Sequence, residues 1–514
     1  MSQDSNASVG WRAAAACGVA AAAVALAVGE IAAAVPAPRA APLSAVDDVV
    51  VAATPGGLVR WATSTFGTSD KFVLGLGTVI VALAFAGVVG VAARRRLWFG
   101  FLGIAAFSAL GVAAAVTRQD ASWWWGYPSI IGGVAGGAVL WGLLRLAVRP
   151  GPEVADPLVY ARRRFLYTVG ATIGGAAVVG YAARAWGQGV ITDAARDAVK
   201  LPAPTDPAPG LPSSARLDVK GITGWKTSNA DFYRIDTALT TPRVDPSGYR
   251  LRIHGRVHKE LTLSFDDLLK RDLIERDITL SCVSNEVGGD LVGNARWIGV
   301  RLDDLLDEVR PHAGADQLVG RSVDGFTAGA PTKLCRDGRD AMLAVGMNGV
   351  PLPVEHGFPV RMIVPGLYGY VSATKWLTEL ELTSFDDFDS YWIPKGWALP
   401  APVKTASRID VPRAKAGAGT VAVAGVAWAQ HRGISKVEVQ VDSGQWHEAR
   451  LSTEVSGDTW RQWVWSWDAK PGDHTLTVRA TDGDGKTQTS QLAPPEPSGA
   501  SGWHSVEVTV SLAG

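Results

Sequence analysis

The sequence predicts three regions in order: an N-terminal all-α membrane domain of about five transmembrane helices, a mixed α+β domain, and a C-terminal β-sandwich of immunoglobulin-like size. Three observations predict this order. Long apolar runs fill the first part of the chain, a proline-rich stretch follows them, and short alternating strands separated by turns fill the last hundred residues. We expect domains at residues 1–190, 213–400 and 401–514, with a linker over residues 191–212.

The membrane domain is predicted from five apolar runs, each close to or above the roughly 20 residues that cross a bilayer core. A cleaved signal peptide is the alternative for the first run, but four more runs follow it. A shorter apolar stretch, Val49–Thr65, is interrupted by Pro55 and Arg60 and is typical of an interfacial or re-entrant segment. The five runs are Ala13–Val35, Phe72–Ala93, Leu97–Thr117, Trp124–Val148 and Phe165–Trp186.

Orientation follows from the arginines, which mark cytoplasmic loops. Arg94–Arg96 lies between the second and third runs, and Arg162–Arg164 precedes the fifth. We therefore expect a multi-pass protein of the cell membrane, with a cytoplasmic amino terminus and everything after the fifth run extracytoplasmic. Arg162–Arg164 followed by Phe165 also resembles a twin-arginine export signal, and a plain cytoplasmic cluster is the equal alternative. For Glu30, inside the first run, a snorkelling carboxylate is favoured over a functional membrane group.

Composition excludes two classes of partner. Neither half of the chain has a dense basic stripe, so nucleic acid is not an expected partner. Histidine is absent before His254 and no C-x-x-C-H motif occurs, so we expect no haem in this chain.

One stretch in the middle domain organises the rest. Cys282 follows a short apolar strand that contains Ile278 and Leu280, and a polar loop comes after it. Strand ends hold reactive groups firmly while a loop keeps them reachable, although a lone cysteine is more often a small buried apolar residue. Cys335 has no partner motif and is expected to be a structural thiol; a Cys282–Cys335 disulfide is the alternative in an oxidising compartment.

The run C-V-S-N from Cys282, followed by R-W-x-G-V-x-L-x-x-L-L from Arg296, resembles the molybdenum-ligand loop of the sulfite oxidase family. The overall order resembles a membrane-anchored, actinobacterial-type member with a C-terminal dimerisation domain. The resemblance implies a mixed α+β molybdopterin-binding domain of the sulfite oxidase type. It also implies a molybdenum–molybdopterin cofactor, with Cys282 as both metal ligand and catalytic residue.

A second segment strengthens the resemblance. H-G-x-P-x-R from His356, followed by P-G and by K-W-L from Lys375, is similar to the second cofactor segment of the family. A pyranopterin phosphate suits a guanidinium (Arg361), an ammonium (Lys375) and a neutral imidazole (His356), whereas the alternative is solvated charge at strand ends. The resemblance also implies cofactor contacts at Ser372, at Thr327 beyond the strand and turn of Ser322–Phe326, and in the entry segment at Asn229, Phe232 and Tyr233.

These residues imply two-electron oxygen-atom transfer on a small oxyanion or sulfur-containing substrate. Glu286 stands where the family carries arginines that bind sulfite, which disfavours sulfite; Arg296, Arg321 and Arg336 are other cations that could bind an anion. A sulfoxide or other S- or N-oxide reductase is the first alternative, and a non-catalytic membrane-tethered binding or assembly protein is the second. The electron-transfer partner is expected to be separate, a cytochrome or a quinone-linked protein, and the C-terminal domain is expected to form a homodimer.

Several local elements are also predicted. Tyr249–Val257 alternates like a half-buried strand, Ser264–Leu269 has a capped helix start, and Leu302–Leu306 begins an amphipathic helix. Proline-rich Leu201–Pro212 is expected to be a stiff spacer that holds the next domain off the bilayer. The aromatics of Ser390–Pro394 could line a substrate channel or plug a domain interface. Core or dimer packing is favoured over carbohydrate stacking for Trp460, Trp463, Trp465 and Trp467.

Overall fold

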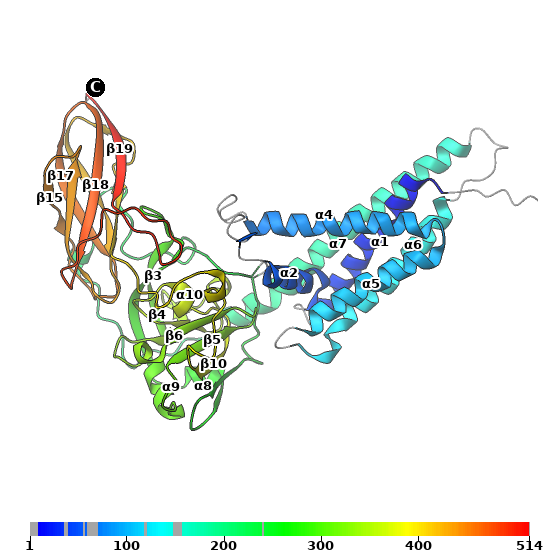
Figure 1. Ribbon diagram of the computed structural model, residues 1–514, viewed down its shortest axis with the longest axis horizontal. Coiled ribbons are helices and arrows are strands. Elements are labelled where there is room, and N and C mark those ends of the chain that lie inside the picture. Colours follow the sequence, from blue (N-terminus) through cyan, green and yellow to red (C-terminus); the bar gives the residue numbers. More distant parts are fainter. Residues whose placement is uncertain are drawn as a thin grey trace, which may run out of the picture. The chain divides into compact units, whose positions relative to one another are not determined.

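A computed structural model describes residues 9–34, 40–54, 57–58, 70–117, 121–147, 157–238 and 241–512. The chain divides into two compact units, drawn in Figure 1. One comprises Met1–Ala194 with Thr237–Arg243, and the other comprises Ala195–Asp236 with Val244–Gly514. We call them the helical unit and the β-rich unit.

Among its described residues, the helical unit contains five helices that are long and apolar enough to cross a membrane: Trp11–Ala33, Gly75–Ala93, Leu97–Val116, Trp123–Ala147 and Phe165–Ala183. These segments confirm that the five predicted runs are helical to within a few residues, and their crossing of a membrane stays a prediction. They belong to helices α1 (Trp11–Ala33), α4 (Asp70–Ala93), α5 (Leu97–Val116), α6 (Tyr127–Ala147) and α7 (Pro157–Asp197), with a short turn, η3 (Trp123–Gly126), before α6. Helix α2 (Pro42–Ala53) is shorter.

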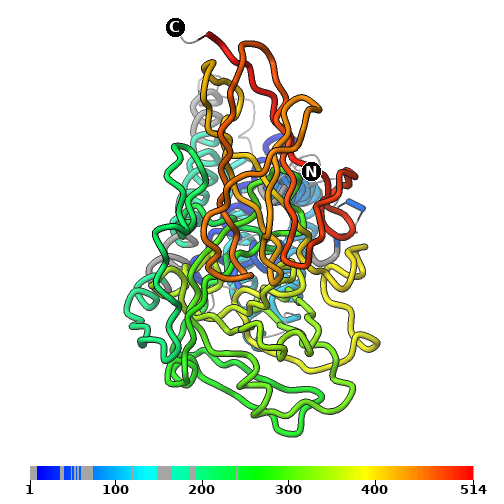
Figure 2. Tube along the Cα trace, turned by 90° about the vertical axis from the view of Figure 1, so that its left-hand side faces the viewer, coloured from blue at the N-terminus to red at the C-terminus, as the bar shows by residue number. Residues whose placement is uncertain are grey.

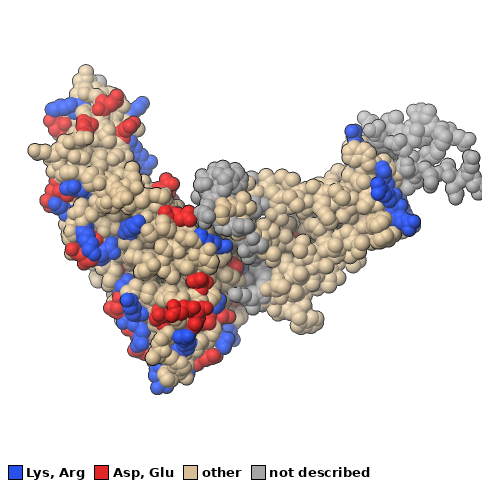
Figure 3. Space-filling view, in the orientation of Figure 1, with Lys and Arg blue, Asp and Glu red and all other residues tan. Residues whose placement is uncertain are grey.

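Small residues allow these helices to pack closely. Helix α1 packs against α4 and α6. A Cβ atom added to Gly18 would lie 2.0 Å from Ala86 O and 2.9 Å from Gly90 Cα, so α1 and α4 meet backbone to backbone. Close approach at glycine is the usual way apolar helices associate in lipid. On the face shown in Figure 3, charged side chains cover the β-rich unit and are nearly absent from the middle of the helical unit.

Two expectations about the helical unit change. Glu30 is only 4% exposed, and its Oε1 accepts a hydrogen bond from the Leu43 N–H at 3.3 Å. The snorkelling interpretation is therefore wrong, because the carboxylate turns inward and holds the start of α2. The predicted interfacial segment Val49–Thr65 overlaps the end of α2, and its residues 55–56 and 59–65 lie outside the described part of the chain.

The first half of the β-rich unit consists of two five-stranded sheets. One has the order β2-β1-β10-β5-β6, and the other has the order β3-β4-β7-β8 with β9 also paired to β7. The strands of the first sheet are β1 (Arg250–Gly255), β2 (Leu261–Ser264), β5 (Gln317–Ser322), β6 (Thr327–Pro331) and β10 (Leu377–Thr383). Those of the second are β3 (Leu273–Ser281), β4 (Val292–Arg301), β7 (Met342–Met347), β8 (Val350–Pro351) and β9 (Arg361–Ile363).

Short helices join these strands, and the predicted ones are present. Helix α8 (Phe265–Leu269) begins with a capping box in which Ser264 and Asp267 satisfy each other's backbone N–H groups. Helix α9 (Leu302–Val309) buries Leu302, Leu305 and Leu306, as its spacing predicts. Helix α10 (Gly369–Ser372) packs against β6.

The last hundred residues form two further sheets, ordered β11-β13-β17-β16 and β12-β19-β18-β14-β15. Figure 2 shows these strands, coloured orange to red, running side by side. They confirm each strand predicted from alternation. The strands are β11 (Ala406–Val411), β12 (Lys415–Gly417), β13 (Gly419–Trp428), β14 (Ile434–Val441), β15 (Trp446–Glu448), β16 (Arg450–Leu451), β17 (Arg461–Ala469), β18 (Gly472–Asp482) and β19 (His504–Ser511).

The tryptophans of this region belong to cores. Trp463 and Trp467 are buried between the two C-terminal sheets. Trp460 joins the core of the first half instead, and its Nε1 donates to Trp225 O at 2.7 Å. Trp465 is half-buried and stacks on the His447 ring, with centroids 4.9 Å apart. Core packing is therefore the correct interpretation for these indoles.

The proline-rich stretch behaves differently from the prediction. Thr205 N–H donates to Leu273 O and Glu275 N–H donates to Asp206 O, each at 2.9 Å. The prediction of a spacer standing apart is wrong, because Leu201–Pro212 is bonded along β3. A domain boundary near residue 400 stays a prediction.

Candidate active site

Cys282 lies immediately after β3, where the chain leaves the sheet. Strands β3 and β4 pair in register from Leu273↔Val300 to Ser281↔Val292. Beyond the last pair, Cys282 N–H donates to Leu291 O at 2.9 Å, and Asn285 Oδ1 accepts from Leu291 N–H at 2.9 Å. The loop is thus closed at its base and braced across its middle, which fixes the Cys282 backbone.

The Cys282 thiol is 9% exposed and is not in a disulfide. Burial raises its pKa, while hydrogen bonds from the N–H and hydroxyl of Ser284 and the nearby charge of Lys375 oppose that rise. Cys335 is also free and buried, with its pKa raised to about 12 by burial. The disulfide alternative is therefore wrong. Cys282 differs from Cys335 in having donors aimed at its sulfur, which would stabilise a thiolate bonded to metal.

Arg361 is the buried cation of the site. It begins β9, whose pairing with β7 sets Arg361 opposite Ala344. Its guanidinium lies 5.0 Å from the centroid of the Trp297 ring, and Nη1 donates to His356 O at 3.1 Å. Among the described residues its Nε has no hydrogen-bond partner. Burial lowers the Arg361 pKa to about 10. A guanidinium that is desolvated and has a spare donor is suited to binding an anion.

Lys375 is the second buried cation, and it is paired. Its Nζ lies 2.8 Å from Asp236 Oδ2 and 3.4 Å from Glu355 O. Burial lowers the Lys375 pKa to about 8 and Asp236 opposes that shift. Asp236, whose carboxylate also lies 3.0 Å from Arg234 Nε, was missed from the sequence. Its signal was its place three residues beyond Tyr233, as the next acid in the entry segment.

His356 is neutral, as the sequence predicts. Its Nε2 lies 2.9 Å from the carbonyl oxygen of Asn229, which requires the proton on that nitrogen. Burial lowers its pKa to about 4. The next residue, Gly357, has a φ of 111°, and a Cβ there would lie 3.1 Å from both Arg361 Cβ and Lys375 Cα. Glycine therefore lets the two cationic segments converge.

The entry segment supplies packing contacts and one tyrosine ring, Tyr233, that interacts with Cys282. Asn229 Oδ1 accepts from Asn348 Nδ2 at 2.7 Å, so its side chain is bonded within the protein. Phe232 is buried edge-on to Trp297 and His356, with centroids 5.7 and 5.6 Å apart. Tyr233 stacks on Phe232 and interacts electrostatically with Cys282 and Arg361. Burial and the Cys282 charge raise the Tyr233 pKa, so its hydroxyl remains a donor.

Thr327 and Ser372 use their hydroxyls within the protein. Thr327 Oγ1 accepts from Tyr391 N–H at 2.9 Å. Ser372 Oγ lies 3.0 Å from Tyr368 O and 3.1 Å from Leu367 O, inside its own turn. Contact of either residue with a cofactor stays a prediction. Tyr368, which sequence reasoning missed, interacts electrostatically with Cys282, and burial raises its pKa to about 12.

The three arginines named as further anion-binding candidates are all paired with carboxylates. Arg296 binds Asp277, its partner on β3, through Nε at 2.9 Å and Nη2 at 2.7 Å. Arg321 binds Glu381 across β5 and β10, and Arg336 binds Asp303 and Asp307. Each of these cations is engaged in an ion pair within the protein, a pairing that spacing in the sequence could not show.

The aromatics of Ser390–Pro394 pack on one another. Tyr391 lies 5.8 Å from Phe326 and 5.1 Å from Trp392, and Trp392 lies 6.2 Å from Trp397. Trp397 in turn lies 5.8 Å from Tyr370, which is the second residue of α10. These rings therefore support the turn that carries Tyr368.

The donor set fits a molybdopterin better than a metal held by protein alone. Among the described residues no group of three or more His, Cys, Asp or Glu side chains could hold a metal ion. A metal at Cys282 would need its other ligands from a cofactor. Arg361, with its unpartnered Nε, and Lys375 offer the charge for the phosphate of such a cofactor.

Comparison with known proteins agrees with this geometry. The family described as the oxidoreductase molybdopterin-binding domain matches residues 238–392. Mitochondrial sulfite oxidase from Mus musculus is 30% identical over 324 residues, which are 53% of this chain and 58% of that protein. The Drosophila melanogaster enzyme is 31% identical over 315 residues, or 50% of this chain and 54% of that protein. Residues 238–392 thus carry a molybdopterin-binding oxidoreductase domain that is similar to that of the sulfite oxidases.

A solved structure of similar fold extends the comparison. The sulfane dehydrogenase SoxCD from Paracoccus pantotrophus superposes with a TM-score of 0.50 at 22% identity, covering 57% of this chain and 85% of that one. At that identity the likeness concerns the fold. The sulfite oxidase homologues above share only about half of their length with this chain.

Proposed function

We propose that this protein is a membrane-anchored molybdenum oxidoreductase that carries out two-electron oxygen-atom transfer on a small sulfur-containing or oxyanion substrate. One observation carries the proposal. A free, buried thiol, Cys282, lies within electrostatic reach of Lys375, while Arg361, close to both Lys375 and Tyr233, keeps an unpartnered donor. A soft thiolate ligand beside desolvated cationic side chains is suited to a metal that is held by a pterin cofactor.

The assignment of roles follows from these contacts. Cys282 would bond the metal, and Arg361 and Lys375 would bind the cofactor phosphate, with His356 as a neutral donor or acceptor. When bound, the cofactor supplies the two-electron redox chemistry. The hydroxyls of Tyr233 and Tyr368 stay protonated near Cys282, so each can donate a hydrogen bond to a substrate oxygen. Buried Phe232 and Trp297 exclude water from behind the site.

A reductase acting on neutral S- or N-oxides is the second candidate function. It is favoured by the pairing of Arg296, Arg321 and Arg336 with carboxylates, which leaves none of these three for a sulfite anion. Exposed Glu286, four residues after Cys282, would repel an anion that approached along the loop. A neutral sulfoxide pays no such electrostatic cost.

The wider setting of the enzyme is also a proposal. The five apolar helices would anchor it in the cell membrane with a cytoplasmic amino terminus and an extracytoplasmic catalytic region. The C-terminal β-sandwich would be immunoglobulin-like and would form a homodimer. Electrons would pass to or from a separate cytochrome or quinone-linked carrier. Reporter fusions on either side of each span would test the orientation. A reporter signal that places the β-rich unit in the cytoplasm would contradict it.

Replacing Cys282 tests the central assignment. In Cys282→Ser we expect dye-linked turnover to fall by at least about a hundredfold, because the alkoxide is a poor replacement for a soft thiolate ligand. Expression and membrane insertion should be unchanged. The matched control is Cys335→Ser, which alters a buried free thiol of the same unit and should keep turnover. Equal activity in Cys282→Ser and the parent protein would refute the assignment.

Two measurements separate the candidate functions. Elemental analysis of the purified full chain should give about one molybdenum per protein, whereas a metal-free preparation from molybdenum-replete cells would favour the non-catalytic binding or assembly alternative. Screening the loaded enzyme against sulfite, sulfoxides and N-oxides with dye donors and acceptors then gives substrate and direction. Faster turnover of sulfoxide than of sulfite would support the second candidate.

A further inference from the structure

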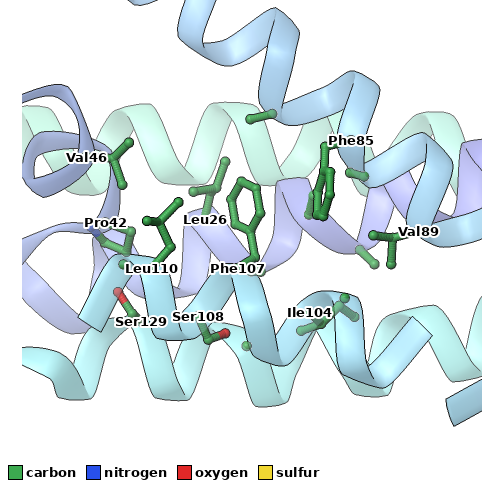
Figure 4. Close-up of a pocket in the computed structure, with 18 of the residues that line it drawn as sticks. Leu26, Pro42, Val46, Phe85, Val89, Ile104, Phe107, Ser108, Leu110 and Ser129 are labelled. Carbon is green, nitrogen blue, oxygen red and sulfur yellow. The ribbon is translucent and has the colours of Figure 1, made fainter. Parts of the chain in front are cut away.

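The helical unit contains an apolar cavity that the proposed chemistry does not use. Figure 4 shows it between α1, α2, α4, α5 and α6, with a cavity volume of about 100 Å³. This is roughly the space of a single ring, since an engineered apolar cavity of about 150 Å³ binds benzene. Phe85 and Phe107 stand next to each other in its wall, stacked with centroids 5.8 Å apart and planes at 24°.

One wall residue is a polar group without a partner. Ser129 is only 5% exposed, and its Oγ makes no hydrogen bond to any described residue. In Figure 4 its hydroxyl oxygen lies on the cavity side of α6, toward Leu110 and Pro42. A Cβ added to Gly111 would lie 2.5 Å from that oxygen, so glycine leaves the hydroxyl room. A buried hydroxyl in an apolar medium calls for an acceptor.

The cavity also reaches the outer surface of the bundle. Phe85 on α4 and Leu110 on α5 both line it, yet they are 45% and 54% exposed. Because these helices have the length and apolarity of membrane spans, that surface would face lipid. A ligand dissolved in the bilayer could therefore enter between α4 and α5 without crossing water.

The side chains that line the cavity restrict the class of ligand that could bind there. No Lys, Arg, Asp or Glu is among the residues that line the cavity, so a phosphate head group would be stranded inside it. A lipid acyl chain would leave the Ser129 hydroxyl unpaired. An isoprenoid quinone supplies both a carbonyl acceptor and a flat ring to lie against aromatic side chains.

We propose that the helical unit binds the ring of an isoprenoid quinone in this cavity, with a ring carbonyl accepting a hydrogen bond from Ser129 Oγ–H, the ring lying against Phe107 and the isoprenoid tail leaving between α4 and α5. The choice of a quinone among bilayer-soluble ligands rests on the proposed function, because an oxidoreductase of this family exchanges electrons with a carrier. The binding itself does not depend on that function.

The test is equilibrium binding to the full-length protein in detergent, with a radiolabelled benzoquinone that carries two isoprene units as the probe. We expect saturable binding of about one quinone per chain. Ser129→Ala should weaken the affinity about fivefold to tenfold, as the loss of one hydrogen bond predicts. Ala82→Phe, which fills the cavity from α4, should abolish binding.

Matched controls make the result specific. Ser44→Ala removes another buried, unpartnered hydroxyl that does not line the cavity, and Ala105→Phe enlarges an exposed residue of α5 outside it. Both should bind the quinone as the parent protein does. Quinone binding that Ala82→Phe leaves intact, or that an excess of phospholipid displaces equally in the parent and Ser129→Ala proteins, would overturn the proposal.

Molybdenum content and dye-linked turnover are measured on the same preparations. They should be unchanged in Ser129→Ala, because the dye replaces the physiological carrier. A protein that binds quinone but lacks molybdenum would refute the proposed function and keep this site. A protein that contains molybdenum and is active with dye but binds no quinone would refute this site and keep the proposed function.

Discussion

Arg361 and Lys375 are buried cations, and the loss of hydration is compensated differently for each of them. Lys375 has Asp236 at 2.8 Å, whereas Arg361 has one carbonyl, the Trp297 ring and a spare Nε. A buried charge without full compensation is costly in a folded protein. The cost is explained if Arg361 is completed by an anionic ligand.

Neutralising Arg361 should therefore cost the protein its cofactor. In Arg361→Met, which keeps the side-chain length, we expect the pterin content per chain to fall at least about tenfold, because the phosphate loses a desolvated partner. Fluorescence of the oxidised pterin released by denaturation measures the content. Arg336→Met, which removes an exposed arginine from the same unit, is the control and should keep full content. Unchanged pterin in Arg361→Met would contradict the predicted phosphate contact.

Lys375 predicts a pH dependence of cofactor retention. Its pKa is lowered to about 8, so the ammonium is present below that pH and is lost as pH rises through it. Cofactor affinity should be level below about pH 8 and decline above. Asp236→Asn removes the charge that supports the ammonium, so the decline should begin at lower pH. Pterin released during dialysis at pH 6 to 9.5 measures it; identical profiles for both proteins would contradict this role.

Residues whose chemistry depends on their type could be singled out from the sequence, although their roles stay predictions, and residues that act through a neighbour were harder to find. Cys282, His356 and Arg361 stand out because thiol, imidazole and guanidinium follow one another in a recognisable order. Asp236 and Tyr368 act through Lys375 and Cys282, which are remote in sequence, and only the place of Asp236 in the entry segment marks it locally. The ion pair of Arg296 with Asp277 could not be predicted, because Asp277 lies on the neighbouring strand.

Among the elements, β3 receives support from three separate parts of the chain. Its backbone bonds to the proline-rich segment at Leu273 and Glu275. Near its other end, Thr279 O accepts from Gln430 Nε2 at 2.8 Å, and Thr279 Oγ1 accepts from Trp460 N–H at 2.8 Å. These contacts stabilise the strand whose end positions Cys282.

Trp460 is the strongest of these supports. Trp460→Ala should destabilise the β-rich unit by about 3–5 kcal/mol, because a buried indole is lost and a cavity remains. Urea unfolding of the full chain, followed by limited proteolysis, measures the change. The half-buried Trp465, changed to Ala, is the control and should cost about 1 kcal/mol or less. Equal losses in the free energy of unfolding for the two substitutions would contradict the larger contribution predicted for Trp460.

Elements defined by their own periodicity were predicted well. The C-terminal strands alternate with period two, and α8 carries both halves of its capping box, so each is encoded locally. Leu201–Pro212 was predicted wrongly because its composition describes a stiff chain but not the neighbour it meets. That neighbour is the outer edge of β3, and an uncovered edge strand attracts extended chain.

At the scale of the whole molecule, the catalytic sheets and the C-terminal sheets belong to one compact unit. Val426, Trp428 and Trp460 lie in the same buried cluster as Trp297 and the strands around it. The family match ends at residue 392, but the core extends past it. The chain order of domains was predictable from composition, whereas this shared core depends on contacts between distant residues.

A truncation tests the shared core. A chain that ends after Val403 should retain the helical unit but lose a soluble catalytic region, because the surface that contacts Trp428 and Trp460 becomes exposed. Protease resistance and molybdenum content of the truncated protein measure the loss. A protease-resistant, molybdenum-loaded product would show instead that residues 213–400 fold independently.

The attachment of Leu201–Pro212 to β3 has a practical consequence for handling this enzyme. Proline-containing connectors are usually where proteases release a catalytic fragment from its anchor, but here the backbone at Thr205 and Asp206 is hydrogen-bonded to β3 through an isolated bridge. Cutting there would require peeling the segment from β3, the strand that Cys282 follows. Shedding by proteolysis should thus be slow, and the liberated fragment should have a disturbed metal centre.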